Sequence, residues 1–308
     1  MKKVVTIGGG TGQFMILNEL KNRTGLEISA LVVMGDNGGS TGELRDSMGV
    51  LPPGDIRQAL VALSPQTNKL RDLFAYRFSH GRVSGHSFGN LFLSALEDLS
   101  GSFTEAIDSA REILSVSHKV LPATLEPLDL LISYRDGSRA VGEKHLDLKH
   151  TEERIESVSL LNPVAINPQA AKVLNEADLI VICPGTFYAS IIPHTLVGGF
   201  ADAIRSRSAP CILLSNIVGP EHTTASDYAT KFEHYAEVSC IDHILCIDPT
   251  QLTDHQNLLN TYEQDKEYLV LPGNDHRVSI KPLLELDSST SLLRHNSRKT
   301  VDTLLTYL

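Results

Sequence analysis

Short apolar runs alternate with amphipathic stretches along most of the chain. Runs that lack acidic and basic residues predict buried strands, because a strand covered by helices on both faces is apolar along its whole length. They lie at residues 4–7, 28–34, 179–183, 211–215 and, less clearly, 243–247 and 269–271. Apolar residues at helical spacing predict helices at residues 14–21, 56–63, 90–99, 106–114, 168–177, 190–206, 227–236 and 299–307. This alternation predicts an α/β fold of the Rossmann-like, doubly wound class with a mainly parallel sheet.

Two segments depart from that alternation. Helices dominate residues 55–115. Residues 119–165 are β-rich, with a hairpin that turns at Asp136-Gly137 and a further strand at 155–161. We expect residues 1–308 to form a single Rossmann-like nucleotide-binding domain that carries this helical segment and a small β-rich insertion.

Composition narrows the classes of partner. The chain has 308 residues, with 27 Lys and Arg against 37 Asp and Glu, and its formal net charge is −10 at pH 7. That charge disfavours a nucleic-acid surface or an anionic membrane, so a phosphate ligand must be held by local dipoles and a few placed cations. The four cysteines lack zinc spacing, and no stretch approaches the roughly 18 apolar residues of a membrane span. A cytoplasmic protein with reduced thiols is expected.

The first apolar run ends in a glycine turn, Gly8-Gly9-Gly10-Thr11-Gly12. In an α/β fold this turn lies at the carboxyl edge of the sheet, where backbone N–H groups and a helix N-terminus, expected near Gln13, favour an anion. Residues 9–12 are therefore candidate phosphate ligands, although a glycine run can also serve only as a tight turn. The spacing fits neither G-x-G-x-x-G nor the Gly-Lys-Ser/Thr of a P-loop, which argues against an ordinary NAD enzyme and a P-loop NTPase.

A second glycine-rich stretch follows the second predicted strand and lies beside the first turn. Two adjacent anion-binding turns suit a diphosphate, or a phosphate together with a sugar. The candidate ligand-binding residues of this stretch are Asp36, Asn37, Gly38, Gly39 and Ser40. Three roles stay open for Asp36: it can bind a ribose, hold a divalent cation, or hydrogen-bond its own backbone in the turn.

Two further motifs precede predicted helices. In Pro52-Pro53-Gly54-Asp55-Ile56-Arg57, Asp55 is either a helix N-cap or a site residue, and Arg57 can reach a phosphate with both terminal nitrogens. In Gly85-His86-Ser87-Phe88-Gly89-Asn90, His86 and Asn90 can donate hydrogen bonds to an anion or a sugar. The alternative for a lone histidine is a purely structural role.

The last candidates follow two later strands. Gly185 and Ser190 lie where a strand turns into a helix, Tyr188 offers a ring for stacking, and Asn216 follows the next strand. All of these motifs are placed for one long cleft across the carboxyl edge of the sheet. The chain lacks a Ser-His-Asp order, a G-x-S-x-G turn and an HExxH motif, so acyl transfer and metallohydrolysis have no support.

Several motifs in fixed order resemble the CofD/YvcK family. They are GGGTG, DNGGSTG, LPPGDIR, YRF followed by GHSFGNL, LPATLEP, ADLIVICPGTFYASIIP and LLRHN. One branch of this family is 2-phospho-L-lactate transferase, which uses magnesium to move a phospholactyl group from a guanosine diphosphate donor to a deazaflavin alcohol. The other branch, of the gluconeogenesis-factor type, is cytoplasmic, binds UDP-sugars and has no established reaction. It is linked to cell shape and to carbon and cell-wall metabolism.

LPPGDIR, GHSFGNL and LPATLEP are more similar to the second branch. The resemblance therefore implies a nucleotide-sugar-binding protein, with a CofD-like transferase as the alternative, and it leaves open whether any reaction is catalysed. It places residues 9–12 and 37–40 against the diphosphate. In the transferase alternative, it makes Asp36 and Asp55 candidate ligands of a magnesium ion, the one cofactor that the family suggests.

The resemblance also assigns two C-terminal residues to UDP-sugar binding. Arg294 aligns with the family's arginine, and Tyr262 is the matching tyrosine, with Tyr268 as a competing position. Two departures bear on base and sugar selectivity: the residues after Asn216 differ from the family pattern, and Asn296 replaces an acid. We expect a nucleoside diphosphate ligand, no nucleic acid, no membrane span and a homo-oligomer.

Overall fold

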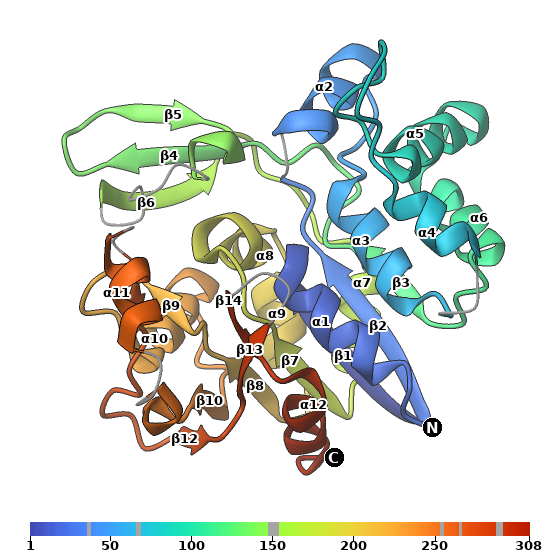
Figure 1. Ribbon diagram of the computed structural model, residues 1–308. Helices are drawn as coiled ribbons and strands as arrows, with labels where there is room; N and C mark the ends of the chain where they lie inside the picture. The colour runs from blue at the N-terminus through green and yellow to red at the C-terminus, as the bar shows by residue number, and fades with distance from the viewer. Residues whose placement is uncertain (36–37, 66–68, 147–153, 253–255, 265–266, 288–291) are drawn as a thin grey trace.

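The central feature of the structure is a seven-stranded sheet in the order β12-β10-β8-β7-β1-β2-β3, in which every neighbouring pair is parallel (Figure 1). The structure is a computed structural model that describes the chain except residues 36–37, 66–68, 147–153, 253–255, 265–266 and 288–291. The strands of this sheet are β1 (Lys2–Gly8), β2 (Leu26–Val32), β3 (Lys119–Pro122), β7 (Leu179–Ile182), β8 (Cys211–Leu214), β10 (His243–Ile247) and β12 (Val278–Lys281). The predicted doubly wound α/β class is confirmed.

The direction in which the chain adds strands reverses between β1 and β7. From β1 the chain adds β2 and then β3 on one side, whereas β7, β8, β10 and β12 extend the sheet on the other side. The connections on either side of such a reversal leave on opposite faces of the sheet, which opens a crevice at the carboxyl ends of the two central strands. The glycine turn follows β1 and the Pro184-Gly185 turn follows β7, so both motifs lie at this crevice.

Helices cover both faces of the sheet, and each face has its own core. Val4 of β1 packs into the first core, whereas Val5 and Ile7 pack into the second, as the alternation of side chains along a strand requires. The first core is covered by α1 (Gly10–Leu20), α3 (Gly54–Leu63), α6 (Phe103–Ile113) and α12 (Ser297–Leu305). The second is covered by α7 (Pro168–Asn175), α8 (Ile192–Leu196), α9 (Phe200–Arg205) and α10 (Ala225–Ala236).

The connection from β2 to β3 contains the predicted helical segment, residues 55–115, which holds α3 and α6 together with α4 (Lys69–Ala75) and α5 (Phe88–Ser100). A further helix, α2 (Gly39–Met48), precedes this segment in the stretch interpreted as a glycine-rich loop. Serine side chains begin two of these helices: Ser87 accepts a hydrogen bond from the N–H of Asn90, and Ser102 accepts one from the N–H of Glu105. Each oxygen satisfies one of the N–H groups that the first turn of a helix leaves unpaired.

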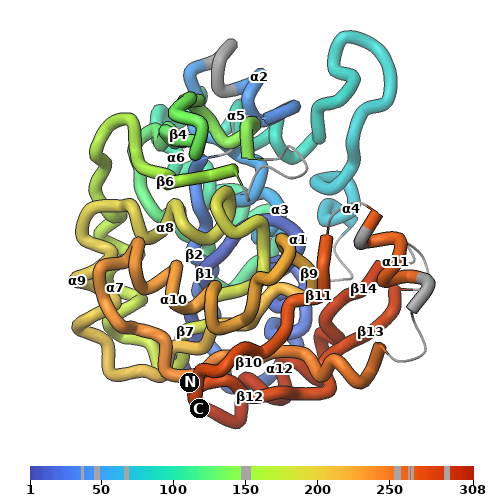
Figure 2. The backbone as a smooth tube through the Cα atoms, turned by 90° about the vertical axis from the view of Figure 1, so that its left-hand side faces the viewer, coloured from blue at the N-terminus to red at the C-terminus, as the bar shows by residue number. Residues whose placement is uncertain are grey.

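The β-rich insertion is a three-stranded antiparallel sheet. It consists of β4 (Leu130–Tyr134), β5 (Arg139–Val141) and β6 (Ile155–Leu160), in the order β5-β4-β6, with a short helix at Glu143–His145. The predicted hairpin at Asp136-Gly137 joins β4 to β5. The predicted start of the insertion at residue 119 is wrong, because residues 119–122 form an edge strand of the central sheet. Figures 1 and 2 place the insertion and α2 at the end of the molecule where the central strands finish.

The single long helix predicted for residues 190–206 does not form. A π-helical turn at Phe187–Ile191 is followed by α8 and then by α9. The break is at Gly198-Gly199, where Gly199 has a φ of 94°. The backbone of Gly198 also exchanges hydrogen bonds with a distant segment, donating to the carbonyl of Val164 at 2.9 Å and accepting from Ile166 at 2.9 Å. These non-local bonds replace the helical ones.

The C-terminal third contains elements that the hydrophobic pattern missed. They are β12, the short helix Pro249–Leu252, α11 (Gln256–Gln264), and the hairpin of β13 (Leu284–Asp287) and β14 (Leu292–His295). The weak strand predicted at 269–271 is β11 (Tyr268–Leu269), which pairs with β9 (Val218–Gly219) outside the central sheet. No helix in the described part of the chain is long and apolar enough to cross a membrane. The single-domain organisation stays a prediction.

Candidate functional site at the topological switch point

The glycine turn after β1 forms the first turn of α1. The helix begins at Gly10 rather than near Gln13, and its N-cap, Gly9, is extended and provides no side-chain cap. The N–H groups of this first turn have no acceptor one turn earlier in the helix, so they can donate to an anion. Gly10 has a φ of 62°, a conformation that favours glycine, and a Cβ at this position would meet no neighbour within 4 Å. The backbone is therefore open on this side.

Asp55 lies directly against the glycine turn. A Cβ at Gly9 would overlap Oδ2 of Asp55, so the close approach of the carboxylate requires glycine. The interpretation of Asp55 as a helix N-cap is wrong, because the N-cap of α3 is Pro53 and no side chain caps that helix. Asp55 is instead in the first turn of α3 and accepts a hydrogen bond from Nε2 of Gln58 at 3.2 Å. The first and third sequence motifs thus meet in space.

The loop after β7 also packs against this turn. A Cβ at Gly12 would overlap the carbonyl oxygen of Pro184, and the Cβ of Ser190 lies 3.6 Å from the position of a Cβ at Gly9. Asn216, which follows β8, pairs with the backbone of Gly185: its Oδ1 accepts from the N–H at 3.0 Å and its Nδ2 donates to the carbonyl at 2.8 Å. The predicted site residues Gly185, Ser190 and Asn216 therefore lie together, and the amide of Asn216 holds the β7 loop in place.

A chain of hydrogen bonds joins α2, α3 and α5. Nε of Arg57 donates to Oδ1 of Asn90 at 2.9 Å, and Nδ2 of Asn90 donates to Oγ of Ser40 at 3.3 Å. Ser40 in turn contacts Nδ1 of His86 at 3.0 Å, and Nε2 of His86 lies 3.3 Å from the exposed carboxylate of Glu43. Ser40, His86 and Asn90 are buried. Because their polar atoms already have protein partners, these residues position α2 and Arg57, and their direct contact with a ligand stays a prediction.

Burial and two neighbouring charges of opposite sign set the electrostatic environment of Arg57. Burial lowers the pKa of Arg57, Arg77 lowers it further, and Asp55 opposes both effects. The side chain packs closely on α5, since a Cβ at Gly89 would lie 2.8 Å from Cγ and Cδ of Arg57. The arginine stays charged nonetheless, because the pKa of a guanidinium starts far above physiological pH. It is a fixed, partly desolvated cation two residues along α3 from Asp55.

His194 forms a hydrogen bond with the residue that precedes the glycine turn. It is fully buried in α8, and its Nε2 donates to the carbonyl of Gly8, the last residue of β1, at 3.1 Å. Burial lowers its pKa to about 4, so the ring is neutral at pH 7, and the carbonyl partner places the proton on Nε2. Sequence analysis missed this residue because a single histidine in an apolar segment gives no local signal.

Tyr188 does not present its ring to a ligand. Its side chain is only 7% exposed and packs at 5.4 Å, between ring centroids, against Phe187 and at 6.3 Å against Tyr235. The prediction of a stacking ring at this position is therefore wrong in this structure. The residue lies in the π-helical turn Phe187–Ile191, a rare conformation that occurs often at functional sites.

The remaining N-terminal candidates lie at the start of α2. Asp36 and Asn37 lie outside the described residues. Gly38 accepts a backbone hydrogen bond from Gly42 at 3.0 Å, and Gly39, the first residue of α2, has a φ of 45°. The start of α2 is thus joined, through Ser40, to the hydrogen-bond chain that reaches Arg57.

Tyr262 and Arg294 are neighbours across the C-terminal elements. The hydroxyl of Tyr262, in α11, accepts a hydrogen bond from the N–H of Leu293 at 3.0 Å, one residue before Arg294 in β14. The competing Tyr268 is in β11 instead. The next residue of β14, His295, is buried and donates to the carbonyl of Ser215, at the end of β8, and burial lowers its pKa to about 4. The hairpin that carries Arg294 therefore adjoins the strand end that carries Asn216.

The donors near the glycine turn can be compared with the needs of a magnesium ion. In the described part of the chain, no group of three or more His, Cys, Asp or Glu side chains is arranged to hold a metal ion. Asp55 places one carboxylate beside the turn. Mg²⁺ is commonly held by one or two carboxylates together with substrate phosphates. The described donors therefore fit a magnesium ion held mainly by a bound diphosphate, with Asp55 as its protein ligand.

The fold and this site define a doubly wound α/β protein with an anion-binding glycine turn at its topological switch point. Residues 4–296 match the family described as 2-phospho-L-lactate transferase CofD, and the chain belongs to this family. The resemblance found in the motifs is thus confirmed.

Similar proteins cover most or all of the chain. A putative gluconeogenesis factor of Thermotoga maritima is 39% identical over 247 residues, which are 79% of this chain and 78% of the relative. The gluconeogenesis factor of Listeria monocytogenes is 37% identical over an alignment of 323 positions, which covers 99% of this chain and 95% of the relative. A crystal structure of a UPF0052 family member from Bacillus halodurans superposes with a TM-score of 0.88 at 31% identity, over 99% of this chain and 100% of that one.

Proposed function

We propose that the protein binds a nucleotide sugar, specifically a UDP-sugar, at the crevice between β1 and β7, as a cytoplasmic binding protein of the gluconeogenesis-factor type. The observation that carries the proposal is the glycine turn itself, which the side chains of Asp55 and Ser190 both approach closely at Gly9. A diphosphate would accept hydrogen bonds from the first-turn N–H groups of α1 and interact favourably with the helix dipole. The relatives named gluconeogenesis factor support the assignment to that type. The proposed role includes a link to cell shape and to carbon and cell-wall metabolism.

The C-terminal elements supply the second part of the proposed site. The hairpin of β13 and β14 adjoins the end of β8, two strands from β1 in the sheet. A UDP-sugar with its diphosphate at α1 would extend toward Arg294, with Tyr262 fixing the backbone beside that arginine. Asp55 would accept hydrogen bonds from sugar hydroxyls. The guanidinium of Arg294 is the group that can contact the nucleotide across this direction.

Titration calorimetry with UDP-N-acetylglucosamine tests the proposal, with UDP, GDP and NAD as competitors. We expect saturable binding of the UDP-sugar, and a loss of about tenfold in affinity for Arg294→Gln, because one charge-assisted hydrogen bond is removed. The matched control is Arg298→Gln, an exposed arginine in the first turn of α12. Absence of binding to the wild-type protein at millimolar ligand would disprove the proposed function.

One observation favours a second candidate, a CofD-like phospholactyl transferase. The Asp55 carboxylate is placed where it could share a magnesium ion with a diphosphate, and such an ion would stabilise the negative charge of a leaving phosphate. The chain's own contribution would be to bind the donor at α1 and to hold the carboxylate in place. The assay is release of guanosine monophosphate from a guanosine diphosphate donor, with magnesium and a deazaflavin alcohol present. Release by the wild-type protein and not by Asp55→Asn would favour this candidate over a binding protein.

A further inference from the structure

A cavity of about 340 Å³ lies between α1, α3 and α4. Its polar lining is Thr11 of α1, Arg57 and Gln58 of α3, and Arg71 and Asp72 of α4, and apolar atoms such as those of Phe14 and Ala75 cover much of the rest. This volume is within the range of small-molecule sites, which are mostly apolar and carry a few placed polar groups. The switch-point crevice between β1 and β7 does not account for it, because α4 belongs to the helical segment between β2 and β3.

Positive charge gathers around this cavity in a chain whose net charge is −10. Arg57 and Arg71 line the cavity. Arg77 is close enough to lower the pKa of Arg57, after the larger effect of burial. Burial, and secondly Arg71, lowers the pKa of Lys21 to about 8. Two arginines thus line the cavity, and each has a further cation close enough to interact with it unfavourably.

In the described part of the chain, the carboxylates near these arginines are Asp55, which acts on Arg57, and Asp72, which lines the cavity beside Arg71. The hydrogen bond of Arg57 runs from Nε to the neutral amide of Asn90. Arg71 donates from Nε to the carbonyl of Val61 at 3.1 Å, and its Nη1 is 3.9 Å from the carboxylate of Asp72, which is 86% exposed. Guanidinium groups that are partly removed from water and face a cavity without a hydrogen-bonded carboxylate favour an oxyanion as their partner.

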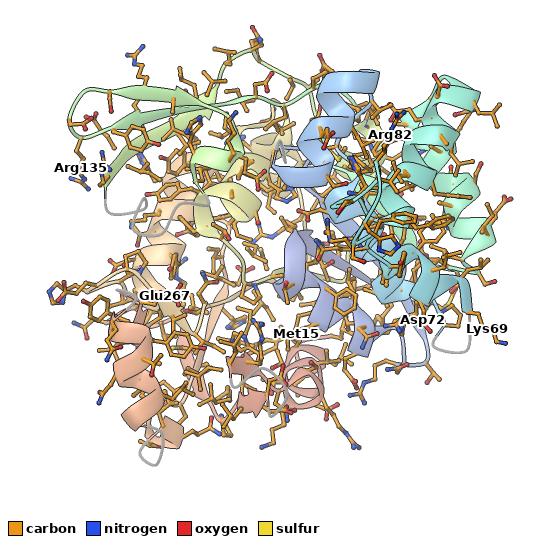
Figure 3. The ribbon with its side chains drawn as sticks, turned by 45° about the horizontal axis from the view of Figure 1, so that its top comes forward. Met15, Lys69, Asp72, Arg82, Arg135 and Glu267 are labelled. Carbon is orange, nitrogen blue, oxygen red and sulfur yellow. The ribbon has the colours of Figure 1, made fainter. Side chains whose placement is uncertain are left out.

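The cavity and the C-terminal part of the proposed nucleotide-sugar site lie on different sides of α1. Figure 1 shows α4 and α11 on opposite sides of α1. Thr11 is the one cavity residue that belongs to the glycine turn. In Figure 3, Asp72 and Lys69 of α4 lie on the side of Met15 that is opposite to Glu267, the residue that follows α11 and the undescribed residues 265–266. A nucleotide sugar that extends toward Arg294 leaves this cavity free.

We propose that the cavity is a second ligand site and that its ligand is a small phosphate monoester. The phosphate would lie between Arg57 and Arg71, with the second N–H of the Gln58 amide, the one that does not donate to Asp55, as an additional donor. The short carbon chain of the ester would lie against Phe14 and Ala75. The protein would then hold two phosphorylated metabolites, one at each side of α1. The proposal goes beyond the proposed function, because a phosphate monoester can occupy the cavity whether or not a UDP-sugar binds.

Titration calorimetry on the full chain tests the proposal with glycerol 3-phosphate, inorganic phosphate and glycerol as probes. We expect saturable binding of glycerol 3-phosphate, weaker binding of inorganic phosphate and none of glycerol. Arg71→Gln should weaken glycerol 3-phosphate by tenfold or more, and Ala75→Trp, at an exposed position, should fill the cavity and abolish binding. The matched control is Arg82→Gln, an exposed arginine that Figure 3 shows well separated from Asp72.

Several outcomes would overturn the proposal. It fails if glycerol 3-phosphate does not bind, if it binds no better than inorganic phosphate, or if Arg71→Gln and Ala75→Trp bind it as the wild type does. It also fails if these two variants lose the UDP-sugar, because the cavity is then part of the nucleotide site. Failure of the proposed function looks different: the wild type would bind glycerol 3-phosphate and not UDP-N-acetylglucosamine. If Ala75→Trp does not fold, Arg71→Gln decides.

Discussion

Alanine substitutions at the three glycines that begin α1 should have three different consequences, because each glycine is required for a different reason. At Gly12, a Cβ would overlap the carbonyl oxygen of Pro184 and lie 2.8 Å from its carbon. Two backbone segments must then separate, which costs about 1–3 kcal/mol of unfolding free energy, as overpacking typically does. At Gly10 the space is open, but a φ of 62° costs an alanine about 1–2 kcal/mol.

Gly9→Ala should act on binding rather than on stability. Gly9 has a φ of −169°, which any residue can adopt, and the atom that a Cβ would meet first is the end of the Asp55 side chain. That carboxylate can rotate away, so the unfolding free energy should change by less than about 1 kcal/mol. The displaced carboxylate can no longer contact a ligand at the turn. We expect the affinity for UDP-N-acetylglucosamine to fall by at least tenfold.

Urea unfolding and calorimetric titration of the three variants measure both effects. Gly25→Ala is the matched control for Gly10→Ala, since Gly25 also has a positive φ, of 78°, and open space around it, but precedes β2 at the opposite edge of the sheet. It should lose as much stability as Gly10→Ala without losing affinity. The reasoning is refuted if Gly9→Ala unfolds at as low a urea concentration as Gly12→Ala, or if it binds the ligand normally.

Three further predictions concern the groups that hold the site together. Burial lowers the pKa of His194 and His295 to about 4, so between pH 6.5 and 4 the unfolded chain binds more protons than the folded one. The unfolding free energy should therefore decrease as the pH is lowered through this window, by up to about 3 kcal/mol per histidine. His194→Gln should make the urea midpoint depend less on pH. An unchanged pH dependence would contradict the burial argument. Asn90→Ala should cost about 2–3 kcal/mol in urea unfolding, because it leaves Nε of Arg57 without an acceptor in a buried network. Asn216→Ala should cost about 1–2 kcal/mol, because it unpairs the N–H and carbonyl of Gly185, and a loss of less than 0.5 kcal/mol would show that water replaces the amide.

The sheet and the position of the site could be predicted because both depend on local signals. An apolar run that ends in glycines marks a buried strand and its carboxyl end, and parallel strands bring such ends to one edge. The turns after β1 and β7 were found in this way. The break in the predicted helix at 190–206 could not be found, because it depends on hydrogen bonds between Gly198 and residues far away in sequence. The helix propensity of the residues in this segment contains no information about such distant partners.

The side-chain roles were harder to predict because they also depend on residues that are far away in sequence. Asp55 was equally suited by sequence to cap α3 or to enter the site. The N-cap of α3 at Pro53 excludes the capping role, and the contact of Asp55 with Gly9, from another element, is compatible with the site role, which stays a prediction. Tyr188 has the composition of a stacking residue, yet the π-helical turn directs its ring into the core, where Phe187 and Tyr235 surround it. His194 has no signature at all, because the carbonyl that it supports is 186 residues away.

The sequence motifs divide into residues that hydrogen-bond to one another and residues that we propose to contact the ligand. Asn216 pairs with Gly185, and Asn90 pairs with Arg57 and Ser40. Each pair joins motifs from different loops, so it fixes the distance between them before any ligand binds. Only a turn fixed in this way can present the first-turn N–H groups of α1 at a constant geometry, which limits the entropy that binding must remove. Substitutions in the pairs should therefore reduce stability and affinity together, whereas substitutions at a proposed ligand contact such as Arg294 should reduce affinity alone.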